Sequence, residues 1–208
     1  MTENRDTLLN SSQLYLIVDA VSGHSGEARL RAALGATKIA SVLITGDKLD
    51  AASARPLVEL IQSFDVAALI DTDAALARAL RADGVHLRSG PQLEAAFTEA
   101  REVLGTRYII GGEAGTRHDA MWLGEAGAEY VAFPPGADQA EFVAWWAEIF
   151  ELPCVAFDVA DLAEASGFAI EGADFVAVRL PSTGSPADIQ QFVQASAAAI
   201  HRPQAAAS

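Results

Sequence analysis

The sequence has few cysteines and few basic residues, and each shortage excludes a class of protein. Its 208 residues include a single cysteine, Cys154, so an intramolecular disulfide framework is excluded. Because Cys154 lies in the apolar run Pro153–Phe157, we expect a buried, inert thiol rather than a nucleophile. Only 14 Lys and Arg residues stand against 28 Asp and Glu residues, which gives a formal net charge of −14. That charge repels nucleic acid and no basic stripe offsets it, so we expect no nucleic-acid partner.

Signals for export or membrane insertion are also missing. Residues Met1 to Ser11 are polar and lack the basic and then apolar layout of a secretory leader. No apolar run approaches the roughly 20 residues that a membrane-spanning helix needs. We therefore expect a cytoplasmic protein with no membrane partner. With 51% hydrophobic residues, the chain can bury one substantial core. The sequence predicts one domain at 14–202, an N-terminal extension at 1–13 and a flexible tail at 203–208.

Short apolar runs alternate regularly with Ala- and Leu-rich stretches of helical length. Such runs are typical of strands that are buried on both faces of a parallel sheet. The predicted strands are Leu14–Asp19, Ile39–Thr45, Val66–Ile70, Gly84–Leu87, Arg107–Gly111, Glu129–Phe133, Pro153–Phe157 and Asp174–Val178. The predicted helices include Ser53–Phe64, Asp73–Ala82, Leu93–Leu104, Arg117–Ala126, Gln139–Phe150 and Pro186–Ile200.

Eight strand-and-helix units predict an α/β fold, a single (β/α)8 barrel of the TIM type. A doubly wound open sheet is the alternative. Glycines such as Gly105 and Gly172 fall where helices should end, and Ser185-Pro186 fits a helix start. In a barrel, functional residues lie at the carboxyl ends of the strands. The candidates there are Asp19, Asp47, Asp71, Asp73, His86, Arg88, Glu113 and Asp158, together with Thr45, Lys48, Thr72, Ser89 and Thr116.

Structural roles compete with functional ones at these positions. One residue of Asp71–Asp73 is expected to cap the following helix, and Asp161 competes with Asp158 for the same role one loop later. His86 lies between apolar neighbours, so we expect its side chain to bond to nearby backbone or to a tyrosine hydroxyl. Trp145 and Trp146 are adjacent and cannot both face the core, so one of them is a candidate subunit contact.

Several segments are similar to one known family. Leu14–Asp19 is similar to an opening strand YLVTD, and Ile70–Leu87 follows a segment INDRVDLALAVGADGVHL without a gap. Further similarities lie at Ile110-Gly111, Ala126–Val131, Pro135 and Gly172–Asp174. On these segments the chain resembles thiamine phosphate synthase and its TenI-type thiazole tautomerase relatives over nearly its whole length. The resemblance implies a barrel enzyme that joins hydroxymethylpyrimidine pyrophosphate to thiazole phosphate with magnesium.

The diphosphate positions that the resemblance implies carry other residues. The family motif VQLREK places a glutamine, an arginine and a lysine where this chain has Leu43, Thr45 and Asp47. Lys48 lies one position away and compensates only in part for the missing lysine. An aspartate in place of a lysine repels a diphosphate by about 1–4 kcal/mol at contact distance.

The metal and phosphate loops depart in the same way. The two aspartates that would hold magnesium fall on Thr72 and Pro91. The serine-threonine-histidine turn after the fifth strand becomes Glu113–Gly115, and the loop after the sixth strand becomes Pro134–Ala137. The phosphate-binding glycines after the seventh strand become Asp158 and Val159.

One combination suited to an anion survives at the eighth strand. A cation, hydroxyls and a helix N-terminus coincide there, where barrels often bind phosphate. The residues are Arg179, Ser182, Thr183, Gly184 and Ser185. In the alternative interpretation, Arg179 pairs with a carboxylate such as Asp158 and contacts no ligand.

Three hypotheses stay open. The favoured one is a barrel without synthase activity that acts as a binding or interaction protein, with a small phosphorylated molecule as candidate ligand and no cofactor. The second is an active synthase or tautomerase with rearranged ligands, using magnesium held by Asp71 and Asp73. The third is a barrel repurposed for another small substrate, in which Asp71, Glu113 and Asp158 converge to bind a metal or to do acid–base work. Catalytic residues are not identified, and a homo-oligomer is an open alternative.

Overall fold

The computed structural model describes residues 12–20 and 24–201. Its strands are β1 (Gln13–Asp19), β2 (Ser41–Thr45), β3 (Ala67–Asp71), β4 (Gly84–Leu87), β5 (Ile109–Glu113), β6 (Tyr130–Phe133), β7 (Cys154–Val159) and β8 (Phe175–Arg179). Its helices are α2 (His24–Leu34), α3 (Ala51–Gln62), α4 (Ala74–Leu80), α5 (Leu93–Leu104), α6 (Arg117–Glu125), α7 (Gln139–Ile149), α8 (Leu162–Glu171) and α9 (Pro186–Ile200). The predicted tail at 203–208 and nearly all of the predicted extension at 1–13 lie outside the described residues.

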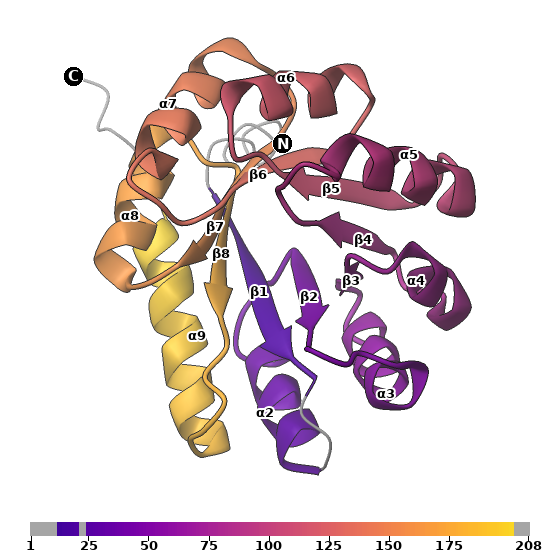
Figure 1. The fold of residues 1–208 in the computed structure, drawn as a ribbon. Helices are drawn as coiled ribbons and strands as arrows, with labels where there is room; N and C mark the ends of the chain where they lie inside the picture. Colours follow the sequence, from indigo (N-terminus) through magenta and orange to yellow (C-terminus); the bar gives the residue numbers. More distant parts are fainter. Residues whose placement is uncertain (1–11, 21–23, 202–208) are drawn as a thin grey trace, which may run out of the picture.

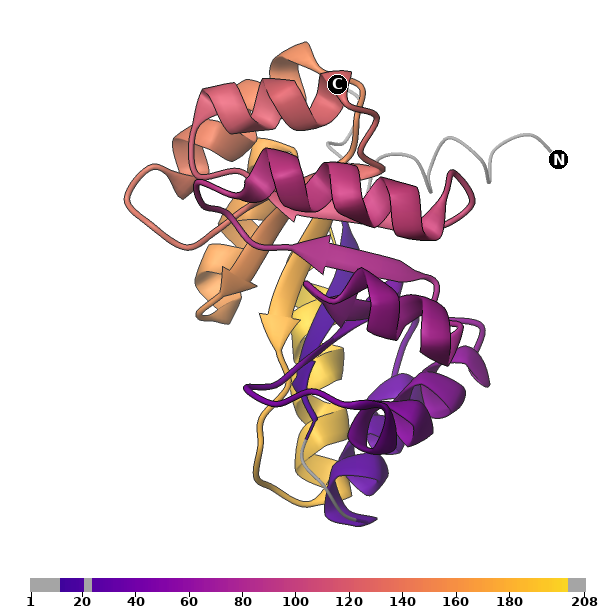
Figure 2. The same ribbon diagram turned by 45° about the vertical axis from the view of Figure 1, so that its right-hand side comes forward.

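The eight strands pair in sequence order into one closed parallel barrel. Strand β1 pairs with β2 on one side and with β8 on the other. The helices surround the strands, and α9 lies beside α2 where the ring of helices closes (Figures 1 and 2). The predicted (β/α)8 barrel is therefore confirmed. An open sheet is excluded because β1 and β8 bond to each other and leave no free edge.

The helix starts follow from local side-chain caps. Asp73 is the N-cap of α4, and its carboxylate accepts a hydrogen bond from the amide of Leu76 at 2.8 Å. Asp161 caps α8, and Ser185 with Pro186 begins α9. These caps satisfy amides that the first turn of a helix leaves without partners. The predicted caps of α4 and α9 are confirmed, and of the two candidates for α8 the cap is Asp161, not Asp158.

The outer core lies between the strands and the helices. It contains every second residue of each strand, because side chains alternate between the two faces of a sheet. Trp146 is buried there while its neighbour Trp145 is half-buried, so only one of the two belongs to the core. Cys154 is fully buried, so the prediction of a buried thiol is confirmed, and burial raises the pKa of the thiol to about 12. No helix of the described residues is long and apolar enough to cross a membrane.

The inner core fills the barrel with the alternate set of side chains. Its largest members are Tyr15, Tyr130 and Phe157. Tyr130 fits only because Gly111 faces it from β5: a Cβ at Gly111 would lie 2.0 Å from the Tyr130 ring. Close packing of this kind is what makes the interior of a small barrel a core rather than a channel.

Four strands run further than the sequence predicts, and β3 does so by one residue, to Asp71. Strand β5 continues to Glu113 and β8 to Arg179, so both side chains project from the last position of a strand. Strand β7 reaches Val159 through a register shift against β8, between Ala156 and Val159. Within that shift Asp158 has a φ of 51°, a left-handed conformation that is uncommon outside glycine. A bulge of this kind redirects a side chain, and here it places Asp158 next to β8.

Candidate functional site

The carboxyl ends of the strands form a polar rim, which we call the mouth. Its residues are Asp19, Thr45, Asp71, His86, Arg88, Glu113, Asp158 and Arg179. Barrel enzymes place their chemistry at this end, and the loops here carry nearly all the sequence-predicted candidates. The geometry of the mouth therefore decides which of those candidates act together.

Arg179 lies at the centre of one group in the mouth. Its guanidinium donates to both carboxylate oxygens of Asp158, from Nη2 at 2.8 Å and from Nε at 3.2 Å. It also donates from Nη1 to Asp19 at 3.0 Å, and Asp19 accepts a second bond from the hydroxyl of Thr45 at 2.6 Å. The bonds to Asp158 raise the pKa of Arg179 above its ordinary value. One guanidinium is thus held by two carboxylates, and the alternative that Arg179 pairs with Asp158 is confirmed.

Arg88 forms a second group with Asp71. Its Nε donates to Asp71 Oδ1 at 3.1 Å, and its Nη2 donates to Asp71 Oδ2. The hydroxyl of Thr72 donates to the same carboxylate at 2.8 Å, and Thr72 itself has a φ of 66°. Asp47 adds a weaker attraction that also raises the pKa of Arg88. The second arginine of the mouth is therefore also neutralised by its own neighbours.

A buried hydrogen-bonded chain leads from the mouth into the barrel. His86 is fully buried, with Nε2 at 3.3 Å from Glu113 Oε1 and Nδ1 at 2.8 Å from the hydroxyl of Tyr130. The Tyr130 hydroxyl lies 3.2 Å from that of Tyr15. The expected tyrosine partner of His86 is confirmed.

The direction of these bonds follows from Glu113, whose carboxylate only accepts. With a neutral imidazole, His86 Nε2 donates to Glu113 while Nδ1 accepts from Tyr130, which in turn accepts from Tyr15. Burial raises the pKa of both tyrosines, so their hydroxyls keep their protons. Burial opposes ionisation of Glu113, but its bond to His86 and its bonds from Ser89 outweigh burial and lower its pKa. Glu113 is therefore an anion at neutral pH.

The predicted phosphate site at the eighth strand is already occupied by the protein's own groups. Asp188, in the first turn of α9, accepts from the amide of Ser185 at 2.8 Å and from its hydroxyl at 2.7 Å. These bonds lower the pKa of Asp188 and hold a negative charge at the helix N-terminus. Ser182, Thr183 and Gly184 are exposed in the loop before it. Phosphate binding by this group of residues stays a prediction.

The mouth does not offer a magnesium site of the family type. Thr72 and Pro91 replace the implied aspartates, and Asp71 and Asp73 are engaged by Arg88 and by the amide of Leu76. Among residues 12–20 and 24–201, no three Asp, Glu, His or Cys side chains gather closely enough to hold a metal ion. The proposed convergence of Asp71, Glu113 and Asp158 is thus not formed as a metal centre, because each carboxylate has a different partner.

A cavity adjoins the Arg179 group. It has a volume of about 450 Å³ and lies between the ends of β7 and β8 and the helices α8 and α9. Asp158 and Arg179 line it together with Asp161, Leu162 and Phe192. Cavities of about 300–1,000 Å³ accommodate drug-sized ligands. Sequence reasoning missed this cavity because it depends on how α8 and α9 pack. It expected a tyrosine partner for His86 but did not identify Tyr130 or Tyr15, because their contacts join strands far apart in the chain.

The fold and the polar mouth define a (β/α)8 barrel, and comparison places it in a family. The family model described as thiamine monophosphate synthase matches residues 14–180, so the chain belongs to that family. A protein named thiamine-phosphate synthase from Erythrobacter litoralis is 37% identical over 209 residues, covering 90% of this chain and 97% of the relative. Another, from Rhodospirillum centenum, is 36% identical over 186 residues, covering 82% and 88%.

Solved structures add support for the fold. The thiamine phosphate pyrophosphorylase from Pyrococcus furiosus superimposes with a TM-score of 0.75 at 20% identity, covering 93% of this chain and 97% of that one. At this identity the likeness concerns the barrel alone. The family assignment therefore rests on the sequence comparisons, and the chemistry of the mouth has to be judged from this chain's own residues.

Proposed function

We propose that this member of the family lacks synthase activity and acts as a binding protein for a small phosphorylated molecule. One observation carries the proposal: both arginines of the mouth are held by carboxylates of the mouth itself. Arg179 bonds to Asp19 and Asp158, and Arg88 bonds to Asp71. Lys48 is the one cation among the candidate mouth residues without a carboxylate partner in the described part of the chain.

A diphosphate would have to displace these carboxylates before it gained any charge-assisted bond. The implied diphosphate lysine is Asp47, and the implied arginine is Thr45, which is buried and bonded to Asp19. Without a built magnesium site, nothing screens the repulsion between the ligand and five or more carboxylates at this end. The cavity beside Arg179 is large enough for a small ligand, which supports a binding function. The cytoplasmic location and the absence of a cofactor stay predictions from the sequence.

The direct test is turnover of hydroxymethylpyrimidine pyrophosphate and thiazole phosphate with magnesium. The Erythrobacter litoralis relative in the same assay serves as the positive control. We expect no turnover above the buffer background. A rate of about 0.1 per second or more would overturn the proposal and favour the synthase with rearranged ligands.

A second candidate function rests on the Glu113–His86 pair. Glu113 is ionised, reaches the mouth with a side chain that is 13% exposed, and is oriented by His86 and Ser89. An ionised and partly accessible carboxylate can accept a proton from a small substrate, as in a tautomerase. Incubation with thiazole phosphates in deuterated water would show exchange of carbon-bound protons. Loss of that exchange in Glu113→Gln would support the second candidate, and no exchange in the wild type would exclude it for these substrates.

A further inference from the structure

Gln139, the first residue of α7, has one of the buried polar side chains of the described residues. Its amide Nε2 donates to the carbonyl oxygen of Phe133 at 2.7 Å and to that of Phe157 at 2.8 Å. Both carbonyls can only accept, so the nitrogen and not the oxygen of the amide faces them. Gln139 therefore uses both of its N–H donors to join the end of β6 to β7.

These bonds lie where the pairing of the strands stops. The register of β6 against β7 ends at the pair Phe133 and Ala156. The register of β7 against β8 is interrupted between Ala156 and Val159. Phe157 therefore lies beyond the first register and inside the interruption of the second. Its carbonyl is held by the Gln139 side chain, whereas the neighbouring strand holds a carbonyl in a regular part of the sheet.

The Phe157 carbonyl belongs to the peptide unit that leads into Asp158. A peptide unit is planar, so a bond to its carbonyl also fixes the direction in which the next residue leaves it. Asp158 has a φ of 51°, and such a backbone conformation persists outside glycine only where the surrounding structure holds it. Gln139 holds the backbone before Asp158, and the pairing of Val159 with Val178 holds it afterwards.

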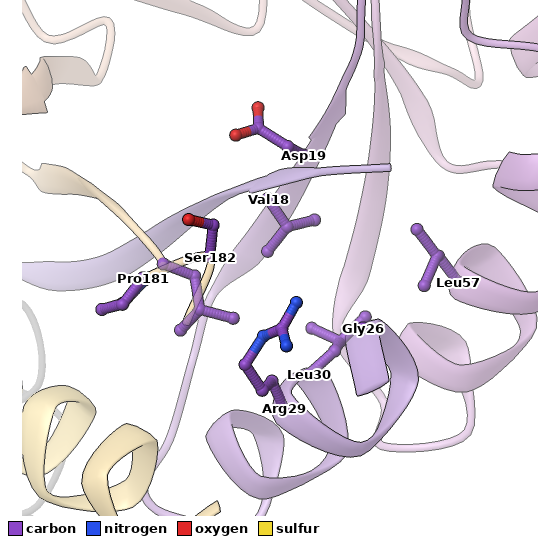
Figure 3. A pocket seen from close by; sticks show the side chains of 9 residues that line it. Val18, Asp19, Gly26, Arg29, Leu30, Leu57, Pro181 and Ser182 are labelled. Atoms are coloured by element: carbon purple, nitrogen blue, oxygen red, sulfur yellow. The ribbon is translucent and has the colours of Figure 1, made fainter. Parts of the chain in front are cut away.

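The position of Asp158 decides how far Arg179 is neutralised. Of the three hydrogen bonds that Arg179 donates to described residues, Asp158 accepts two and Asp19 accepts one. Figure 3 shows the carboxylate of Asp19 pointing away from Arg29, and this carboxylate also accepts from Thr45 at 2.6 Å. Without Asp158, the guanidinium would keep a single shared carboxylate, and its Nε and Nη2 groups would be available to an anion.

We propose that Gln139 is a positioning residue of the mouth. By fixing the peptide unit before Asp158, it sets that carboxylate against Arg179 and keeps the guanidinium unavailable to the oxygens of a phosphate. Gln139 follows Pro134–Ala137, the loop that departs from the family pattern. The inference rests on the proposed function, in which the mouth neutralises its own arginines, and it adds the residue that maintains this state.

The test compares Gln139→Leu with a matched control, Gln62→Leu. Leucine is similar in size to glutamine and removes both N–H donors. The Nε2 of Gln62 also donates to two oxygens, the carbonyl of Arg81 at 2.9 Å and the carboxylate of Asp83 at 3.1 Å. Asp83 directly precedes β4, so these bonds lie at the opposite end of the barrel from the mouth. The two variants therefore lose the same number of bonds in different places.

The measurement is the exchange of the Arg179 Nε–H with water, followed by NMR on the full chain and assigned with Arg179→Lys. We expect this exchange to be about fivefold faster or more in Gln139→Leu, because the bond from Nε to Asp158 opens more often. In Gln62→Leu it should change by less than about twofold. Unchanged exchange in Gln139→Leu, or equal acceleration in the two variants, would overturn the proposal.

A background of Asp158→Asn distinguishes positioning from a general loosening of the fold. There Gln139→Leu should accelerate the exchange by less than about twofold further, since the charge on which it acts is already gone. A larger acceleration would mean that Gln139 acts through another group and would also overturn the proposal. Should Gln139→Leu fail to fold, as judged by circular dichroism, Gln139→Asn replaces it with the same expected results, because its shorter amide cannot reach both carbonyls.

Pyrophosphate affinity, measured by calorimetry with a chelator present, separates this inference from the proposed function. Faster exchange and tighter binding in Gln139→Leu would support both. Faster exchange with unchanged affinity would support the positioning role of Gln139 and contradict the proposal that neutralised arginines exclude a phosphate. Unchanged exchange in Gln139→Leu, with tighter binding by Asp158→Asn, would overturn the positioning role alone.

Discussion

The inside of the barrel and its mouth both contain polar side chains, but these differ in kind and in exposure to water. Inside, His86, Tyr130 and Tyr15 are buried and linked in one chain, with no buried side-chain nitrogen or oxygen of the described residues left without a partner. At the mouth, Arg179 and Arg88 form ion pairs that are partly open to water. Removing the partner of a buried polar group costs about 1–3 kcal/mol of stability, whereas an exposed ion pair contributes about 0–1 kcal/mol. Stability therefore restricts which residues the inside of the barrel can have, whereas residues at the mouth can be replaced at little cost in stability.

The largest effect is expected at Gly111. In Gly111→Ala the new Cβ would lie 2.0 Å from the Tyr130 ring, so the ring must move and the chain to His86 must break. We expect a loss of about 3 kcal/mol or more in the free energy of unfolding, measured by chemical denaturation. Gly136→Ala is the control, because its Cβ meets nothing within 4 Å, and a similar loss there would contradict the packing argument.

Tyr130→Phe should have the next largest effect. It removes the hydroxyl between His86 and Tyr15 and leaves both of their polar groups buried without that partner. We expect a destabilisation of about 1–3 kcal/mol. Tyr15→Phe removes only the end of the chain and leaves the bond from Tyr130 to His86 in place, so its loss should be smaller. Equal losses of stability in the two variants would contradict the order of hydrogen bonds described for these three side chains.

The pH dependence of stability should be smaller, and it should depend on Glu113. Its pKa in the folded protein is below the ordinary value of 4.5, so its carboxylate stabilises the fold above that pH. The contribution is lost as the pH falls through the folded pKa, because both states then bind the proton. We expect the stability difference between wild type and Glu113→Gln to shrink between pH 6 and about pH 3. If the free energies of unfolding of wild type and Glu113→Gln change equally with pH, a lowered pKa of Glu113 is excluded.

The sequence is sufficient to predict the scaffold, because strand runs and helix caps depend on local pattern, and eight strand-and-helix units indicate a closed barrel. Asp73 and Ser185 illustrate this: each caps the helix that its spacing indicates. The mouth is less predictable, because its pairs join residues far apart in the chain, such as Arg179 and Asp19. The bulge that turns Asp158 towards Arg179 leaves no signal in the sequence beyond a charged residue at a strand end.

The central claim, that the mouth neutralises its own cations, is tested most directly by pyrophosphate affinity with a chelator present. We expect weak, millimolar binding by the wild type and about tenfold tighter binding by Asp158→Asn, because removing one carboxylate partly frees Arg179. Asparagine also tolerates the left-handed backbone at this position. Asp138→Asn makes the same charge change at the exposed start of α7, where the carboxylate caps nothing, and should leave affinity unchanged. Micromolar binding by the wild type, or equal affinities of Asp158→Asn and Asp138→Asn, would contradict the account.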